Sequence, residues 1–270
     1  MLIGDAYEGL LRERRPQIAG NALENASRGT AQSRITFECT EPITLNDMLG
    51  SPLRQAWMGA KYLVTRRGPM AGPSATVHAL VRATPERARP NVKIQLHHLS
   101  SADRMGSQKN YGLDPFPGFA IGFFQLRPQS RGHLHIRSRQ VAEQPHIDPR
   151  YFSDEGDCTE MLEAIRLSRR VSQQAGMARF VRRETRPGPD ATSDTELLDY
   201  IRASAQTSWH PIGTCKMGTD DMAVVDASLR VRNVAALRVV DSSIMPTMPS
   251  PNTNAASIMI GEKAADLILG

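Results

Sequence analysis

Residues 239–269 read VVDSSIMPTMPSPNTNAASIMIGEKAADLIL, and a short distance before them residues 209–218 read WHPIGTCKMG. The longer stretch holds Pro246, Pro249 and Pro251 within six positions. Proline and the residue before it avoid helical backbone angles, so residues 244–251 are predicted to form an extended loop. A helix is predicted directly after this loop, capped by Thr253 or Asn254. Its inner stripe is predicted to be Ala256, Ile260, Ala264, Leu267 and Ile268.

These two stretches place His210 and Asn252 on separate loops, roughly forty residues apart in the sequence. Pro211 keeps His210 out of the helical region. Taken alone, a histidine in a loop is more often a hydrogen-bonded structural residue, and Asn252 or Asn254 is more often a helix cap or a turn residue. The helix start at Thr253–Ala256 also offers unpaired N–H groups and partial positive charge, which suit a reduced flavin, a carboxylate or a phosphate.

The overall composition is that of a globular chain. The 270 residues are 40% hydrophobic and 23% charged, and no apolar run approaches the roughly 18 residues that a membrane span needs. The start, MLIGDAYEGLLRERRPQ, has no apolar signal region, and three distant cysteines favour a reducing compartment, so we expect a cytoplasmic protein. The net charge of +5 comes mainly from scattered arginines without interleaved aromatic residues, so no nucleic-acid partner is expected.

The middle of the chain is predicted to form one open antiparallel sheet. Residues alternate between apolar and polar in Arg34–Cys39, Val92–His98 and His133–Ser138, and Phe119–Leu126 is rich in aromatic residues. Ala236–Asp241 has the pattern of a short buried strand. Residues 1–33 are irregular apart from a helix expected around Tyr7–Arg15.

Three further helices are predicted. One begins at Thr44 or Asn46 and runs through residues 60–65, with Leu49, Leu53, Ala56, Trp57 and Ala60 on its inner face. A second is predicted from a capping box at Asp157 and Glu160. A third is predicted from a capping box at Ser193 and Glu196 and runs through Ser204. Together with the sheet, these helices predict an α+β fold.

The joint pattern is more specific than any of its parts. WHPIGTCKMG is followed by VVDASLRVRNV (224–234), LRVVDSSIMP (237–246) and NTNAASIMIGEKAADLI (252–268). This series resembles the carboxy-terminal signature of the glucose–methanol–choline (GMC) oxidoreductases, in particular their choline-dehydrogenase-like branch. Weaker matches lie upstream, in residues 45–46, 67–69, 127–132, 145–151 and 157, so the resemblance covers about residues 34–270.

The resemblance implies an enzyme that oxidises the CH–OH group of a small-molecule alcohol and passes its hydride to N5 of bound FAD. His210 matches the catalytic histidine and Asn252 the second active-site position. An imidazole has an ordinary pKa of about 6.5 and accepts a proton at neutral pH, and an amide can donate to the developing alkoxide. Cofactor contacts are implied for Trp209, Asp241, Ser242, Thr253 and Asn254.

The family's other half does not match. It opens with G-x-G-x-x-G between a strand and a helix, and no G-x-G occurs in this sequence. The G-x-N-L-x-D-H stretch of the family is reduced here to GNALENASRGTAQS (20–33). We therefore expect an irregular or decayed segment at residues 1–33, a substrate-binding domain at 34–205 and a flavin-site segment at 206–270. The Gly-rich Rossmann half is expected to be missing or supplied by a partner, and the alternative function is a truncated inactive remnant or half of a split enzyme.

Other classes have weaker support. No G-x-S-x-G elbow of a serine hydrolase occurs in the sequence. A zinc site at His210 and Cys215 lacks further ligands at usable spacing. His97 and His98 would point to opposite faces of a strand, so a metal cluster that joins them to His133 and His135 is not expected. No metal site is therefore predicted, and a small-molecule binding module without redox chemistry stays the third alternative.

Overall fold

The computed structural model describes residues 29–73, 75–102, 112–138, 140, 142–250 and 252–270. The helix predicted around Tyr7–Arg15 and most of the segment 1–33 lie outside these residues. The chain packs into two compact units. Taking only the described residues, we call them the sheet unit, within residues 32–125 and 158–206, and the α8 unit, within residues 29–31, 126–157 and 207–270. The predicted boundaries after residues 33 and 205 divide the chain by the function expected of each part, whereas the two units are defined by packing. These functional boundaries stay a prediction.

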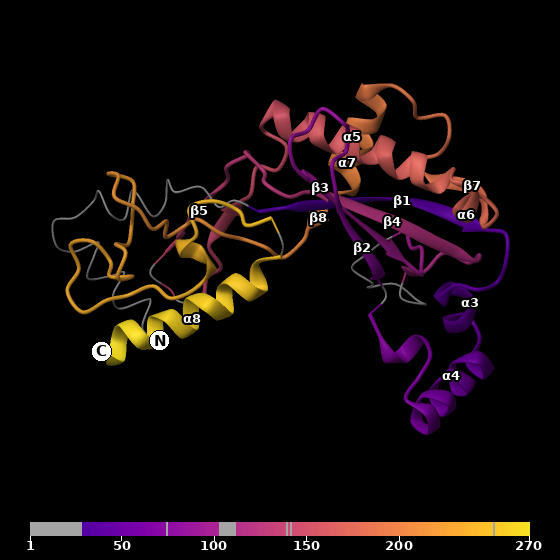
Figure 1. Ribbon diagram of the computed structural model, residues 1–270, viewed down its shortest axis with the longest axis horizontal. Coiled ribbons are helices and arrows are strands. Elements are labelled where there is room, and N and C mark those ends of the chain that lie inside the picture. Colours follow the sequence, from indigo (N-terminus) through magenta and orange to yellow (C-terminus); the bar gives the residue numbers. More distant parts are fainter. Residues whose placement is uncertain (1–28, 74, 103–111, 139, 141, 251) are drawn as a thin grey trace. The chain divides into compact units, whose positions relative to one another are not determined.

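The sheet unit is built on an antiparallel sheet in the strand order β2-β3-β4-β1-β7 (Figure 1). The short strand β8 (Gln206–Thr207) also pairs with β1. The apolar residues Ile35, Phe37 and Cys39 of β1 are buried, and the rings of Phe37 and Phe119 stack 5.0 Å apart across the β1–β4 pair. The strands of the order are β1 Ala31–Cys39, β2 Ala75–Val81, β3 Val92–His97, β4 Gly118–Gln125 and β7 Val181–Arg186. The predicted α+β class and three of the predicted strands are confirmed.

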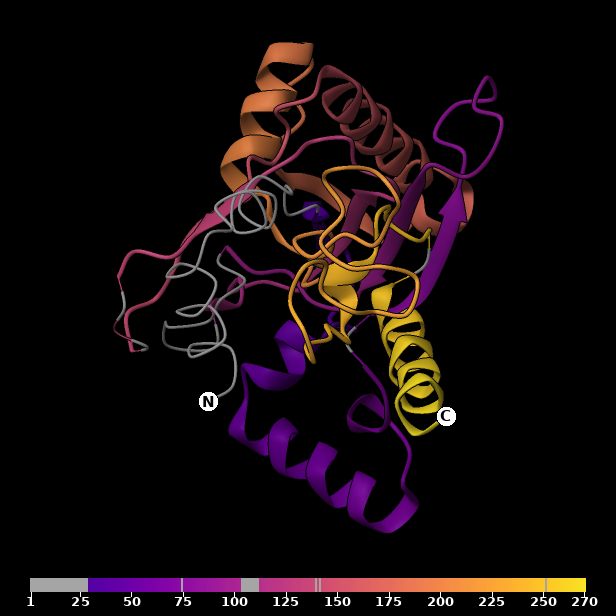
Figure 2. The ribbon, with the colours of Figure 1, turned by 90° about the vertical axis from the view of Figure 1, so that its left-hand side faces the viewer.

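Helices α5 (Glu155–Ser172) and α7 (Asp194–Ser204) lie on the same side of this sheet (Figures 1 and 2). Each buries one apolar stripe, which includes Met161 and Ile165 in α5 and Leu197 and Ile201 in α7. The predicted capping box of α7 is present, since the Ser193 hydroxyl accepts from the Glu196 N–H while the Glu196 carboxylate accepts from the Ser193 N–H. The short helix α6 (Ala175–Ala178) leads into β7.

The helix predicted from Thr44 through residues 60–65 is broken into α3 (Leu45–Leu49) and α4 (Pro52–Thr65). Pro52 has no N–H to continue α3, and it occupies the first position of α4, where that N–H is not needed. Thr44 does cap α3. The predicted buried face is wrong, because Leu53 and Trp57 are 81% and 60% exposed.

Strands β7 and β2 are the longest of the strands that escaped prediction. Strand β7 reads VRRETR, which has no apolar alternation, and its side chains are held by ion pairs instead. Arg183 and Arg182 both bind the carboxylate of Glu38 on β1, and Glu184 binds Arg169 of α5. Strand β2 lies at the sheet edge, where its residues are mostly exposed, so its pattern carried little signal.

The α8 unit is rich in loops. It contains the hairpin β5 (His133–His135) and β6 (His146–Asp148), the turn η3 (Ser242–Ile244) and the long helix α8 (Thr253–Leu269). The strand predicted at His133–Ser138 is thus only three residues long. The strand predicted at Ala236–Asp241 is wrong, since this segment makes only isolated bonds, such as those joining residues 229–231 to 237–239. Among the described residues, no helix has the length and apolar character that crossing a membrane would require.

Asp157 holds the turn at residues 127–131 and is not the predicted helix cap. Helix α5 begins two residues earlier, at Glu155. The Asp157 carboxylate is buried and accepts from the N–H groups of Gln129 and Ser130, both at 2.8 Å, and from the Ser130 hydroxyl at 2.5 Å. A helix cap and an acceptor for distant backbone N–H groups both require a short acidic side chain. The spacing of Asp157 and Glu160 in the sequence therefore could not show which of these two roles Asp157 has.

We expect Asp157→Ala to lower the free energy of unfolding by about 3 kcal/mol, because three donors lose their buried acceptor. Urea denaturation of the purified chain measures this change. Asp199→Ala is the matched control. Asp199 is largely exposed and its 3.9 Å ion pair with Arg202 is expected to contribute less than about 1 kcal/mol. Equal effects of the two substitutions would contradict the role assigned to Asp157.

Candidate functional site

His210 is fixed by the strand end that precedes it and by the prolyl residue that follows it. Its Nδ1 atom lies 3.0 Å from the Ser208 hydroxyl and 3.3 Å from the Thr30 hydroxyl. Ser208 is buried, and both its N–H and its hydroxyl donate to the Thr30 carbonyl, at 2.9 and 2.8 Å. The half-buried imidazole is therefore oriented at its Nδ1 atom by these two hydroxyls.

The Trp209 side chain is 68% exposed, and its backbone is left-handed, with φ of 62°. The Trp209 N–H donates to the Thr207 hydroxyl at 3.1 Å, which stabilises this turn. A bulky residue rarely adopts this conformation without support from its surroundings. The turn sets the direction in which the chain presents Trp209 and His210.

The turn η3 links the Pro-rich loop to residues 209–218, which we call the histidine segment. Ser242 donates its hydroxyl to the Pro211 carbonyl at 3.0 Å, next to His210 in the chain. Asp241 caps η3 by accepting from the Ser243 N–H at 2.7 Å. The N–H groups of Cys215 and Met217 bond the carbonyls of Ser243 and Ile244, at 3.0 and 2.8 Å. Asp241 and Ser242 are thus held beside the segment that carries His210.

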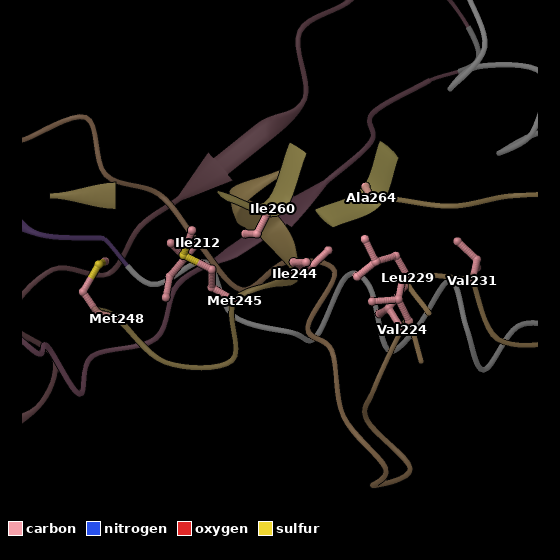
Figure 3. Close-up of a cluster of buried hydrophobic side chains, with 10 residues drawn as sticks. Ile212, Val224, Leu229, Val231, Ile244, Met245, Met248, Ile260 and Ala264 are labelled. Carbon is pink, nitrogen blue, oxygen red and sulfur yellow. The ribbon is translucent and has the colours of Figure 1, made fainter. Parts of the chain in front are cut away.

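One apolar core anchors these segments and helix α8 (Figure 3). Ile212 from the histidine segment, Met245 and Met248 from the Pro-rich loop and Ile260 from α8 are all buried in it. In Figure 3, Ile212, Met245 and Ile260 are grouped together, with Met248 at one end of the cluster. The core continues through Val224, Val225, Leu229, Val231, Ile244 and Ala264. The predicted inner stripe of α8 is largely confirmed, with Ile268 the exception at 57% exposed.

Asn252 ends the Pro-rich loop and occupies the cap position of α8, which was predicted for Thr253 or Asn254. Its exposed side chain makes no capping hydrogen bond to the helix. Thr253, the first helical residue, is buried, while Asn254 is exposed. Ser250 lies two residues before Asn252 and accepts a hydrogen bond from Arg127. This bond ties the Pro-rich loop to the turn that Asp157 holds. The start of a 17-residue helix therefore keeps its partial positive charge without a side-chain cap.

A metal function finds no support at this site. Burial raises the pKa of the Cys215 thiol above its ordinary value, which disfavours the thiolate that a metal needs. Within the described part of the chain, no group of three or more histidine, cysteine, aspartate or glutamate side chains is placed to hold a metal ion.

The residues around His210 were only partly predictable. Ser208 lies two positions before the histidine and could have been found as a polar neighbour. Thr30 is 178 positions away from Ser208 and belongs to the segment that was predicted to be irregular. No pattern in the sequence connects the two.

The fold matches that of a domain found in flavoprotein oxidoreductases. Residues 128–261 match the GMC oxidoreductase family model for the carboxy-terminal domain. Formate oxidase from Aspergillus oryzae RIB40 has a TM-score of 0.80 at 20% identity, over 92% of this chain and 47% of that chain. Pyridoxine 4-oxidase from Mesorbium loti has a TM-score of 0.73 at 24% identity, over 91% of this chain and 43% of that chain. These likenesses show the fold.

Residues 128–261 therefore form a carboxy-terminal domain of the GMC oxidoreductase type, and the homologues and structural neighbours of this domain use FAD. The chain is 39% identical to the alcohol dehydrogenase [acceptor] of Pseudomonas putida, over 77% of this chain and 37% of the relative. It is also 39% identical to the oxygen-dependent choline dehydrogenase of Escherichia coli O45:K1 (strain S88 / ExPEC), over 87% of this chain and 41% of the relative. The chain therefore spans about two fifths of the length of the curated relatives that it matches.

Proposed function

We propose that this chain is the substrate- and flavin-contacting part of an FAD-dependent oxidoreductase that acts on the CH–OH group of an alcohol. In this proposal, His210 and Asn252 both contact the substrate hydroxyl. The observation that carries it is the common anchoring of the two segments. The histidine segment and the Pro-rich loop share one apolar core, and Ser242 hydrogen-bonds the residue that follows His210.

Each residue has a chemical role that suits its type. The His210 imidazole accepts the proton of the alcohol hydroxyl. The Asn252 amide donates a hydrogen bond to the same oxygen, where negative charge develops as the proton leaves. FAD, when bound, supplies the hydride acceptor for the carbon of the alcohol. The chain's own part is to place the hydroxyl and remove its proton.

The residues present fit the isoalloxazine end of FAD. The start of α8 carries partial positive charge and has no side-chain cap, which suits a flavin pyrimidine ring that becomes negative on reduction. Thr253 and Asn254 would offer backbone N–H groups there, and Trp209, Asp241 and Ser242 would border the ring. The adenine end has no comparable residues in this sequence, since the Gly-rich turn that binds pyrophosphate is missing. A partner polypeptide or a fused segment would supply it.

The names of the relatives suggest small alcohols or choline as substrates. The experiment below therefore includes both kinds of substrate. The three cysteines form no disulfide in the described structure, which agrees with the proposed cytoplasmic location.

Reconstitution tests the proposal. The chain is co-expressed with, or fused to, the Gly-rich nucleotide-binding half of the alcohol dehydrogenase relative, and FAD content is adjusted to one equivalent. Under anaerobic conditions, a panel of primary alcohols and choline is added while the flavin absorbance is followed. Loss of the oxidised flavin band with at least one alcohol is expected. A stable, FAD-loaded complex that no alcohol reduces would contradict the proposed activity.

A second function is favoured by one observation. No G-x-G occurs in the sequence, which is the feature expected of half of a split enzyme or of an inactive remnant. A binding partner that restores activity would indicate the split enzyme. A chain that folds but never forms an FAD-loaded complex would indicate the remnant.

In the reconstituted enzyme, we expect Asn252→Ala to lower kcat on the order of ten- to a thousandfold, because one donor to the developing oxyanion is lost. Steady-state kinetics with the best alcohol measures the change. Asn252→Asp has nearly the same size but no N–H donor, so it is expected to lose as much. Asn252→His keeps a donor and is expected to retain more activity than either. Equal activity of all four proteins would exclude the role of Asn252.

A further inference from the structure

The two hydroxyls beside His210 restrict the position of its ring proton. Ser208 Oγ and Thr30 Oγ1 lie 3.0 and 3.3 Å from Nδ1, and they also contact each other. All three residues belong to the α8 unit. The Ser208 side chain is buried, so water competes little for its hydroxyl.

The donors and acceptors can be assigned in order. The Thr30 carbonyl can only accept, and the Ser208 hydroxyl donates its single proton to that carbonyl at 2.8 Å. The Ser208 oxygen is then left as an acceptor, for the Thr30 hydroxyl and for His210 Nδ1. With the Ser208 proton in the bond to the carbonyl, a nitrogen 3.0 Å from the Ser208 oxygen completes a hydrogen bond only when the nitrogen carries its own proton.

We infer that Thr30 and Ser208 are positioning residues that hold neutral His210 in its Nδ1–H tautomer. The imidazole lone pair is then on Nε2. A histidine that removes a proton needs its lone pair on the nitrogen that faces the substrate, and a partner at the other nitrogen commonly fixes this choice. The consequence for catalysis rests on the proposed function, whereas the tautomer itself does not.

Nitrogen NMR of the chain labelled with 15N-histidine tests the inference without FAD. The spectrum is recorded about two pH units above the ordinary histidine pKa of about 6.5, where the ring is neutral. The His210 signals are assigned as those lost in His210→Gln. The two ring nitrogens of the wild-type chain are expected to show the Nδ1–H pattern. An Nε2–H pattern would overturn the inference.

The variants test whether the hydroxyls cause this tautomer. Ser208→Ala and Thr30→Val each remove one hydroxyl and are expected to shift the tautomer ratio roughly three- to tenfold toward Nε2–H, the effect of one hydrogen bond. Ser208→Thr and Thr30→Ser keep the hydroxyl and should restore the wild-type pattern. An unchanged ratio in both hydroxyl-free variants would overturn the inference. If Ser208→Ala does not fold, the Thr30→Val and Thr30→Ser pair decides.

Failure of this inference can be told apart from failure of the proposed function. In the reconstituted enzyme, Ser208→Ala should lower kcat with little change in KM, because the base is in the wrong tautomer. Full turnover in His210→Ala, together with an Nδ1–H pattern in the wild-type chain, would remove the proposed function and leave the tautomer assignment intact.

Discussion

Replacing His210 with alanine is expected to lower kcat of the reconstituted enzyme at least about a hundredfold, the usual scale for the loss of a positioned general base. The alcohol would then have to lose its hydroxyl proton to water. KM should change little, because the imidazole helps most in the transition state rather than in the bound ground state. Stopped-flow reduction of the flavin by alcohol isolates this step from later reoxidation.

The same substitution should leave the fold intact. His210 is half-buried in a loop, and Ser208 keeps its two bonds to the Thr30 carbonyl when the ring is gone. The thermal midpoint of His210→Ala should therefore match that of the wild-type chain. His146→Ala is the matched control, since His146 is exposed on β6 and has no role in the proposal. Full activity in His210→Ala would mean that the chain is better treated as a binding module.

The parts of the fold that alternation defines could be predicted from the sequence. Strands β1, β3 and β4 alternate or are strongly apolar, and all three are found within a few residues of their predicted bounds. Strand β7 could not be found in this way, because its register depends on Glu38 of another strand. The segment at residues 236–241 shows the converse. It has a strand-like composition, but the structure gives it no neighbouring strand in the described chain to complete a ladder.

The candidate site divides in a similar way. Its two central residues, His210 and Asn252, stand in short motifs with prolines, and the resemblance of the joint pattern to the GMC signature nominated them. The groups that orient them are remote in sequence. Thr30 reaches His210 across 180 positions, and Arg127 reaches Ser250 across 123. Such contacts arise from the packing of the α8 unit, and their side chains carry no local pattern.

The purified chain alone is expected to hold well below one equivalent of FAD. The pyrophosphate of FAD normally rests on a Gly-rich turn at a helix start, where closely approaching backbone N–H groups bind it. This sequence contains no G-x-G, so the proposed site at the start of α8 has residues for the isoalloxazine end and none of the Gly-rich turn for the pyrophosphate. Contacts to the isoalloxazine alone give too little binding free energy to offset the conformational entropy that the flexible FAD molecule loses when it binds.

Equilibrium dialysis with FAD and with FMN sharpens this expectation. Because the sequence has no Gly-rich turn for the pyrophosphate, the two flavins should bind with similar weak affinity. The complex with the nucleotide-binding half should take up about one equivalent of FAD and should prefer it strongly over FMN. Asn254→Pro, which removes one N–H from the first turn of α8, should weaken both flavins equally if that turn contacts the ring. Near-stoichiometric FAD on the chain alone, with preference over FMN, would reveal an adenine site that neither the motifs nor the described structure predicts.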